Sequence, residues 1–346
     1  MKNVSLALDI NSIYLSYVNF NSYLCDVESI KKTREKIYNC DEQAIKDTIE
    51  HAKKIKKSLN LKIEEDNFLQ TEEESKKMYL KSKKYLLNGH KKNNKLPTAI
   101  IIGGQQGSGK TGIVLKSIMD FKAIEQDVVV LDLDAYRGFY KNYFKLILKY
   151  PESYSKFTNS CVGKIMEKLT KEVINQKYNF IFEGTLKSTY TLDLLLNSPI
   201  TYNIIVKVMG VSREESILSN FERYIKMKRK TGLGRLTKIS EHDDRYFSLV
   251  DTIKRLNSTN VEIEVYERKK GSDLPELIYK TSNNNNVYSD AYEALIDARK
   301  KSHIDCIKTS DIRLKKVIED LKKIGDFEKL YSEIQQLKAI FNTKEK

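Results

Sequence analysis

The sequence has 346 residues, of which 40% are hydrophobic, so it can form about two or three domains with buried cores. Its 61 lysines and arginines outnumber 47 acidic residues and give a formal net charge of +14, which favours an anionic substrate or partner. Many of the lysines fall on solvated helix faces, so we do not expect nucleic acid as the partner. No apolar run approaches the ~18 residues of a membrane span, and the residues after Met1 do not resemble a signal sequence. Four cysteines without paired spacing predict reduced thiols in a cytoplasmic protein.

Residues 1–70 are predicted to form a helical N-terminal extension. Residues 4–18 begin with strand-like alternation and continue with helical spacing, so the pattern leaves this segment ambiguous. The apolar residues of 41–59 fall on one stripe and predict an amphipathic helix, and those of 72–87 predict another. The polar run over 90–95 predicts a loop before the core.

Strands and helices alternate through a central domain that we place at residues 71–290. This alternation predicts an α/β fold with a P-loop NTPase-like, mostly parallel sheet flanked by helices. Ligands bind such sheets beyond the carboxyl ends of the strands. The predicted strands cover residues 98–102, 127–132, 179–182, 202–208 and 261–266. The predicted helices cover residues 112–119, 139–150, 159–176, 212–230 and 240–256.

Residues 291–346 are predicted to form C-terminal helices. One apolar stripe runs through 311–324, and a second runs through 327–341 at heptad-like spacing. These helices either pack back on the core or pair with a partner chain, and the pattern leaves both arrangements open.

A glycine-rich motif lies between the strand predicted at 98–102 and the helix predicted at 112–119. Its spacing is that of a P-loop, in which backbone N–H groups at a helix N-terminus bind the phosphates of a nucleotide. Lys110 is long enough to reach the β- and γ-phosphates, and the Thr111 hydroxyl is a candidate Mg²⁺ ligand. The predicted nucleotide-binding residues are Gly104, Gln105, Gln106, Gly107, Ser108, Gly109, Lys110 and Thr111.

Carboxylates follow two of the predicted strands, where catalytic groups of such a sheet lie. A kinase needs one carboxylate to orient and deprotonate the acceptor hydroxyl, and Asp134 is the candidate because it lies just past its strand. Asp132 either supports Mg²⁺ or caps the next helix. Glu183 follows an apolar run, where a carboxylate is costly unless it is paired or used.

Residues 221–235 have the pattern of a lid, a cation-rich helix end followed by a glycine-containing loop. Phosphoryl transfer needs positive charge against the moving group, and arginine offers a planar fork suited to phosphate oxygens. Arg223 and Arg235 are therefore the candidate catalytic arginines.

Together these segments resemble the zeta toxin family of P-loop kinases, the toxins of epsilon/zeta-type toxin–antitoxin pairs. The resemblance covers roughly residues 72 to 290. It depends on five stretches in the same order and spacing: Gly-Gly-Gln-x-Gly-Ser-Gly-Lys-Thr at 103–111, Asp-x-Asp-x-aromatic-Arg at 132–137, Glu-Gly-Thr at 183–185, Arg223-Tyr224, and Arg235 to His242-Asp243.

The resemblance implies an ATP- and Mg²⁺-dependent kinase that phosphorylates a hydroxyl of UDP-N-acetylglucosamine and so blocks cell-wall synthesis. By this analogy Asp134 is the general base, and Lys110, Arg223 and Arg235 stabilise the γ-phosphate. The implied sugar-nucleotide site contains Glu167, Glu183, Thr185, Lys187 and Arg137.

One departure and three alternatives accompany this resemblance. The His-Pro pair that many relatives carry after the Asp-x-Asp stretch is missing from Gly138 to Asn142, a segment that borders the acceptor pocket. Other acceptors stay open, namely a nucleic-acid end, a nucleoside or an antibiotic, and so does a non-catalytic nucleotide-dependent switch. A helical antitoxin is the implied partner, either as a separate protein or as residues 1–70 in cis, and the alternative interpretation of residues 1–70 is extra packing helices.

Overall fold

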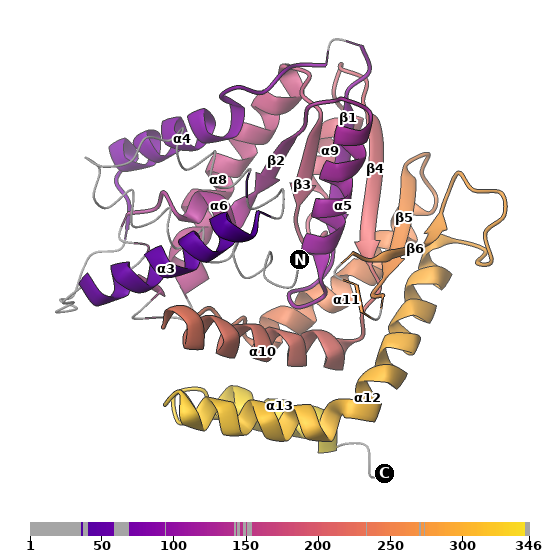
Figure 1. Cartoon of the computed structure of the whole chain (residues 1–346). Helices are drawn as coiled ribbons and strands as arrows, with labels where there is room; N and C mark the ends of the chain where they lie inside the picture. Colours follow the sequence, from indigo (N-terminus) through magenta and orange to yellow (C-terminus); the bar gives the residue numbers. More distant parts are fainter. Residues whose placement is uncertain are drawn as a thin grey trace. The chain divides into compact units, whose positions relative to one another are not determined.

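The computed structural model describes most of the chain between Asp41 and Asn342 (Figure 1). The chain divides into two compact units. Unit 1 consists of Met1–Lys91, Val129–Gln176 and Lys226–Leu236, and unit 2 of Lys92–Val128, Lys177–Ile225 and Thr237–Lys346. The described residues are 36, 41–58, 69–93, 95–141, 143, 146–147, 150, 154–232, 234–269, 271–272 and 274–342.

Unit 2 is built on a mostly parallel sheet with the strand order β3-β1-β4-β5-β6. The first four strands are parallel, and β6 pairs antiparallel to β5 at the edge. Ile101 of β1 pairs with Phe182 of β3 on one side and with Val206 of β4 on the other. The apolar runs are buried as expected for parallel strands. The strands are β1 (Thr98–Gly103), β3 (Phe180–Glu183), β4 (Asn203–Met209), β5 (Glu262–Glu267) and β6 (Glu276–Lys280).

Helices pack on this sheet within unit 2. Helix α5 contacts β1, β3 and β4, whereas α12 contacts β5, β6 and α11. The final helix, α13, contacts α11 and α12, so both C-terminal helices pack on the rest of unit 2. The helices are α5 (Lys110–Ala123), α9 (Tyr190–Leu196), α10 (Arg213–Thr231), α11 (Ile239–Leu256), α12 (Ala291–Lys323) and α13 (Tyr331–Asn342), and the last turns of α10 belong to unit 1.

Among its described residues, unit 1 contains one short strand and several helices. Helix α4 begins with a capping box formed by Thr71 and Glu74, and it contacts both β2 and α8. The Tyr79 hydroxyl of α4 donates to the Glu172 carboxylate of α8 at 2.7 Å. The elements are α3 (Glu42–Ser58), α4 (Glu72–Leu87), β2 (Val129–Asp132), α6 (Leu133–Arg137) and α8 (Tyr154–Asn175).

The predicted fold class, a mostly parallel sheet flanked by helices, is confirmed, and each predicted strand has a counterpart. Three short elements escaped prediction: α6, α9 and the edge strand β6. Helix α8 begins at Tyr154, earlier than the predicted residue 159. The segment 4–18 and part of the helix predicted at 139–150 lie outside the described residues. Among the described helices, none combines the length and the apolar character needed to cross a membrane.

Candidate active site

The glycine-rich segment Gly104–Thr111, which we call the phosphate loop, connects β1 to α5. Gly107 and Gly109 have φ values of 76° and 97°, a region that side chains with a Cβ rarely adopt. A Cβ on Gly107 would also lie 2.0 Å from the Ser216 carbonyl oxygen. Gly109 is the N-cap of α5, so the loop ends at the positive pole of a helix, where anions bind.

Polar groups inside the phosphate loop are arranged to bind an anion. The Lys110 ammonium donates to the Gln105 carbonyl oxygen at 3.0 Å, and the Ser108 N–H lies 3.3 Å from the same oxygen. The buried Ser108 hydroxyl has no hydrogen-bond partner among the described residues, which fits a loop that accepts a ligand oxygen. The side-chain amide nitrogen of Gln105 anchors the loop, because it donates to Val211 O and Ser216 Oγ, both at 3.0 Å.

A buried histidine supports the phosphate loop through Ser216. His242 Nε2 lies 2.8 Å from Ser216 Oγ, and its Nδ1 lies 3.2 Å from Asp243. Arg213 donates twice to the Asp243 carboxylate, each time at 2.7 Å. Burial lowers the pKa of His242, so the ring is neutral at pH 7. Burial opposes ionisation of Asp243 as well, but His242 and Arg213 outweigh it and lower its pKa to about 2.

Two arginines that sequence reasoning did not select contact the phosphate loop. Arg245 of α11 lies 3.4 Å from the Gln106 side-chain oxygen. Arg268, just after β5, donates to the carbonyl oxygens of Ser108 and Gly107. Its only sequence signal is its place after a predicted strand, and the family motifs do not include it.

The predicted sugar-nucleotide residues of unit 2 lie at the end of β3 and just after it. Glu183 is the last residue of β3, in register with Ile102, and both Glu183 and Thr185 are partly exposed. Lys187 forms an ion pair with Asp244 of α11.

Arg223 lies on α10, where its guanidinium is 3.5 Å from the Asn220 side-chain oxygen one turn earlier.

The carboxylate of Asp134 in unit 1 is held between two arginines. Arg235 donates to one carboxylate oxygen at 2.7 Å, and Arg137 donates to the other at 3.0 Å. Both guanidinium groups lie over the Tyr154 ring, at 5.8 Å and 5.7 Å from its centroid. Desolvation would raise the pKa of Asp134, but Arg235 and Arg137 outweigh it and hold the pKa well below its ordinary value. This carboxylate is therefore ionised at neutral pH.

Two neighbours of Asp134 have structural bonds of their own. Asp132 is the N-cap of α6 and accepts from the Asp134 N–H at 2.9 Å, which is the capping role that the sequence left open. Arg137 is buried and also donates to Thr158 and Asn159 of α8. Arg137 thus fixes α6 against α8 while it holds Asp134.

The remaining predicted residue, Glu167, lies on the exposed side of α8. It pairs with Lys171 one turn later, at 2.9 Å. The described residues contain no group of three His, Cys, Asp or Glu side chains suited to a metal ion.

Comparison with known proteins decides the family. The sequence model described as Zeta toxin matches residues 83–283, more than half of the chain. The protein belongs to the zeta toxin family. This match lies within the region of resemblance and contains the phosphate loop, the Asp134 cluster and the Glu-Gly-Thr stretch. The recognition made from sequence motifs is therefore confirmed.

Two relatives in this family are 28% and 29% identical to the chain over the aligned residues. Toxin PezT of Streptococcus pneumoniae serotype 4 is 28% identical over 233 residues, which are 65% of this chain and 88% of PezT. Toxin zeta of Streptococcus pyogenes is 29% identical over 186 residues, or 52% of this chain. That match spans 63% of the S. pyogenes toxin, a little under two thirds of its length.

A solved structure agrees with the zeta toxin fold. It comes from a molecular and structural characterization of the PezAT chromosomal toxin–antitoxin system of S. pneumoniae. It superposes with a TM-score of 0.58 at 24% identity and covers 73% of this chain and all of that one. The likeness supports the fold described above.

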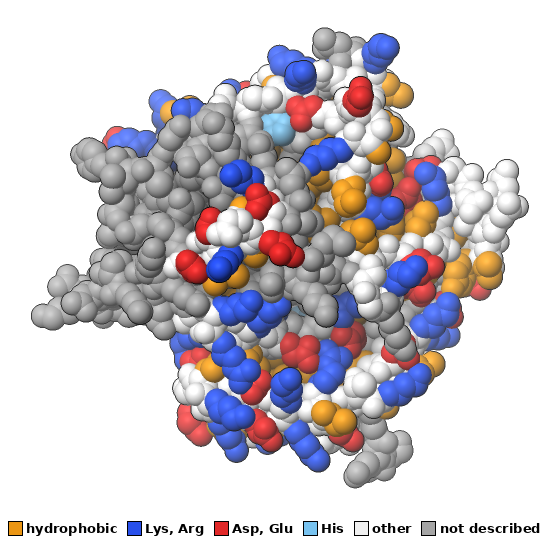
Figure 2. Space-filling model, viewed as in Figure 1, with side chains coloured by type: hydrophobic (Ala, Val, Ile, Leu, Met, Phe, Trp, Pro, Cys, Tyr) orange, Lys and Arg blue, Asp and Glu red, His pale blue; other side chains and the backbone are white. Residues whose placement is uncertain are grey.

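On the face shown in Figure 2, basic and acidic side chains are interspersed over α10 and α13. The net charge of +14 is therefore not gathered into one uninterrupted basic surface on that part of this face. A groove for a polymer needs a continuous basic stripe, whereas a small phosphorylated ligand needs only a few aimed cations.

Proposed function

We propose that the protein is an ATP-dependent kinase toxin that transfers the γ-phosphoryl group to a hydroxyl of UDP-N-acetylglucosamine. The observation that carries the proposal is the phosphate loop. It combines glycines with positive φ, a buried Ser108 hydroxyl without a hydrogen-bond partner among the described residues, and Lys110 at the start of α5. Membership of the zeta toxin family supports kinase chemistry on this loop. The acceptor follows from the family resemblance alone.

In this proposal Asp134 takes the proton of the acceptor hydroxyl as its oxygen attacks the γ-phosphorus. The bond from the γ-phosphorus to the β–γ bridging oxygen breaks, and ADP leaves. Lys110, Arg223 and Arg235 stabilise the charge that develops on the transferred group.

The Asp134–Arg235 contact suggests how the base becomes competent. A carboxylate held by two arginines is a weak base, because both guanidinium groups stabilise its ionised form. Arg235 follows Gly232, whose φ is 71°, at the end of the predicted lid. If the phosphate draws Arg235 away, Asp134 keeps only Arg137 and its basicity rises as the acceptor arrives.

Mg²⁺ would bind together with the nucleotide rather than at a site formed only by protein ligands. Magnesium in kinases is held by one or two protein oxygens together with substrate phosphates and water. The Thr111 hydroxyl in the first turn of α5 is the residue proposed to hold it. Bound there, the ion would neutralise charge on the β- and γ-phosphates.

The acceptor site is proposed to include the strand-end residues Glu183 and Thr185 with Lys187. Lys187 now pairs with Asp244, so a substrate phosphate would have to compete with that carboxylate. Glu167 and Arg137 complete the proposed set, with Arg137 acting through its hold on Asp134.

We propose that a helical antitoxin controls the protein and that both act in the cytoplasm. The related structure comes from work on a toxin–antitoxin system, which supports a separate protein partner. Most of residues 1–70 lie outside the described residues, and an inhibitory role for them in cis stays a prediction. Deletion of 1–70 should raise ATP turnover if they inhibit, and an unchanged rate would reject that role.

Mass spectrometry of the reaction product tests the proposal. The full chain incubated with ATP, Mg²⁺ and UDP-N-acetylglucosamine should yield a sugar nucleotide that carries one additional phosphoryl group, and Lys110→Ala should yield none. A panel of nucleosides, oligonucleotides and aminoglycosides provides the alternative acceptors. Transfer to one of these instead would overturn the acceptor, and tight ATP binding without any transfer would overturn the kinase.

A further inference from the structure

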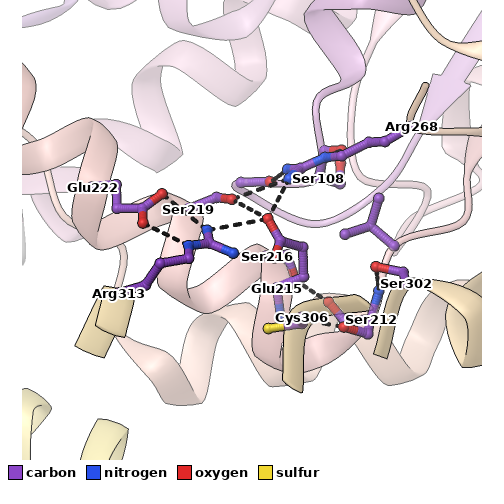
Figure 3. Close-up of polar contacts among 12 residues, drawn as sticks. Ser108, Ser212, Glu215, Ser216, Ser219, Glu222, Arg268, Ser302, Cys306 and Arg313 are labelled. Atoms are coloured by element: carbon purple, nitrogen blue, oxygen red, sulfur yellow. Dashed lines mark hydrogen bonds and ion pairs between the residues drawn. The ribbon is translucent and has the colours of Figure 1, made fainter. Parts of the chain in front are cut away.

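Arg268 contacts the backbone of the phosphate loop from outside it. Its Nε donates to the Ser108 carbonyl oxygen at 3.1 Å (Figure 3). Its terminal nitrogen donates to the Gly107 carbonyl oxygen. Arg268 follows the last residue of β5, which is parallel to β4 and, through it, to β1. The side chain therefore starts at the same sheet edge from which the phosphate loop leaves β1.

Holding these two carbonyls orients the N–H groups that a phosphate would use. In a trans peptide the C=O and N–H bonds point in opposite directions. The Gly107 carbonyl shares its peptide unit with the Ser108 N–H, and the Ser108 carbonyl shares its unit with the Gly109 N–H. Because Arg268 holds both oxygens, both N–H groups point away from it, and the Ser108 N–H lies toward Gln105 O inside the loop.

Glu215 of α10 fixes the guanidinium of Arg268. Arg268 Nη1 lies 2.6 Å from Glu215 Oε1 and 3.2 Å from Ser219 Oγ. Burial disfavours the charge on Glu215, but Arg313 and Arg268 outweigh it and keep the pKa of Glu215 below its ordinary value. Glu215 thus remains a carboxylate that both arginines can share.

The second arginine on Glu215 comes from the C-terminal helix. Arg313 of α12 donates to both oxygens of Glu215 and to both oxygens of Glu222 (Figure 3). Helix α12 is also tied to the start of α10, because the Ser302 hydroxyl accepts from the Ser212 N–H at 3.0 Å. Arg313 lies beyond residue 283, where the family match ends.

We propose that Arg268 is a positioning residue of the phosphate loop, and that α12 sets its position through Arg313 and Glu215. The chain of contacts runs from Arg313 to Glu215, then to Arg268 and the loop carbonyls, all within unit 2. Arg268 acts on the loop backbone, whereas Arg313 acts only through Glu215. This inference rests on the proposed use of ATP and adds control by a segment outside the family match.

ATP binding by the full chain, measured calorimetrically without acceptor, tests the proposal. Arg268→Ala should weaken binding by about tenfold, because it removes two hydrogen bonds from a charged donor. Arg313→Ala should weaken it by about threefold, since Arg268 keeps its loop contacts but loses its fixed partner. The double variant should bind no more weakly than Arg268→Ala, because the second change acts through the first. Arg313→Lys keeps a positive charge beside the Glu215 carboxylate, so this variant should recover part of the lost ATP affinity.

Lys316→Ala is the matched control, because it removes a positive charge from an exposed position of the same helix. It should bind ATP like the wild type, and circular dichroism should show each variant folded. Equal binding by wild type, Arg268→Ala and Arg313→Ala would overturn the inference while the proposed function stands. Failure of the wild type to bind ATP would overturn both.

Binding of inorganic tripolyphosphate, which has no nucleobase, distinguishes a role of Arg268 in positioning the loop from a direct contact between Arg268 and the base of ATP. If Arg268 positions the loop, Arg268→Ala weakens tripolyphosphate and ATP binding by similar factors. A loss confined to ATP, with Arg313→Ala unchanged, would assign Arg268 to the base and overturn the proposal.

Discussion

The two units hold similar charged groups in different proportions. In unit 1 the single carboxylate of Asp134 faces two guanidinium groups, those of Arg137 and Arg235. These three side chains carry one positive charge in excess. Arg137 is buried against α8, whereas Arg235 lies on the segment that follows Gly232.

The cluster in unit 2 is balanced. Two carboxylates, Glu215 and Glu222, face Arg268 and Arg313, so the four charges cancel. Arg313 is held at both carboxylates and Arg268 at a carboxylate and two backbone carbonyls. A cluster with excess positive charge is suited to receive an anion, and a neutral one is suited to hold elements in place. We therefore expect changes in the first cluster to alter turnover and changes in the second to alter stability and loop geometry.

The largest effect is expected for Asp134→Asn. Loss of the general base should lower kcat by up to about 10⁴-fold, while the amide keeps the shape of the side chain. The free energy of unfolding at pH 7 should also fall, because the ionised carboxylate is stabilised by Arg235 and Arg137 in the folded protein. Steady-state kinetics and urea unfolding measure the two quantities, with the exposed Asp251→Asn as the control. A variant that retains wild-type turnover would remove Asp134 from the chemistry.

A comparison of Arg235→Ala with Arg137→Ala separates the two arginines. Arg235→Ala should lower kcat by about 10³-fold, as expected for an arginine that stabilises a transferring phosphate, and it should reduce stability less than Arg137→Ala does. Arg137→Ala removes a buried guanidinium bound to Thr158 and Asn159, and it should destabilise the fold. Measurement of kcat and urea unfolding on both variants checks this. Equal effects on both quantities in the two variants would contradict the division of roles.

In the balanced cluster, Glu215→Gln should act mainly on stability. It leaves Arg268 and Arg313 facing each other without their shared carboxylate, at a cost of about 3 kcal/mol in unfolding free energy. Urea unfolding at low and high salt measures the cost, which should shrink as salt screens the repulsion. An unchanged stability would mean that solvent or Glu222 replaces this carboxylate.

The smallest expected effect concerns Asp243 and acid pH. Its folded pKa, about 2, lies below its ordinary value of 3.8, so the carboxylate stabilises the fold at pH values above that ordinary value. The contribution, about 2 kcal/mol, should decrease as the pH falls from about 4 to about 2. Asp243→Asn should therefore be less stable than wild type at pH 7, and the gap should close in that interval. Urea unfolding across pH checks this, and a gap independent of pH would refute it.

Local patterns in the sequence were sufficient to predict much of the fold and to locate the glycine-rich loop between β1 and α5. The P-loop spacing, the apolar strands and the amphipathic stripes are properties of neighbouring residues, and they predicted β1, α5 and α4. The short elements α6 and β6 escaped because a few residues carry too little periodicity, and β6 pairs with β5 at the sheet edge.

Sequence alone indicated the glycine-rich loop between β1 and α5, and it predicted a candidate base and a cationic lid, because each of these predictions depends on a short motif. Only the tertiary structure decided which charges meet. The partners of Arg268 come from the phosphate loop and α10 and, through Glu215, from α12, three segments that are far apart in the sequence. Ion pairs between distant segments depend on how the sheet and helices pack, and no spacing rule within the chain specifies them.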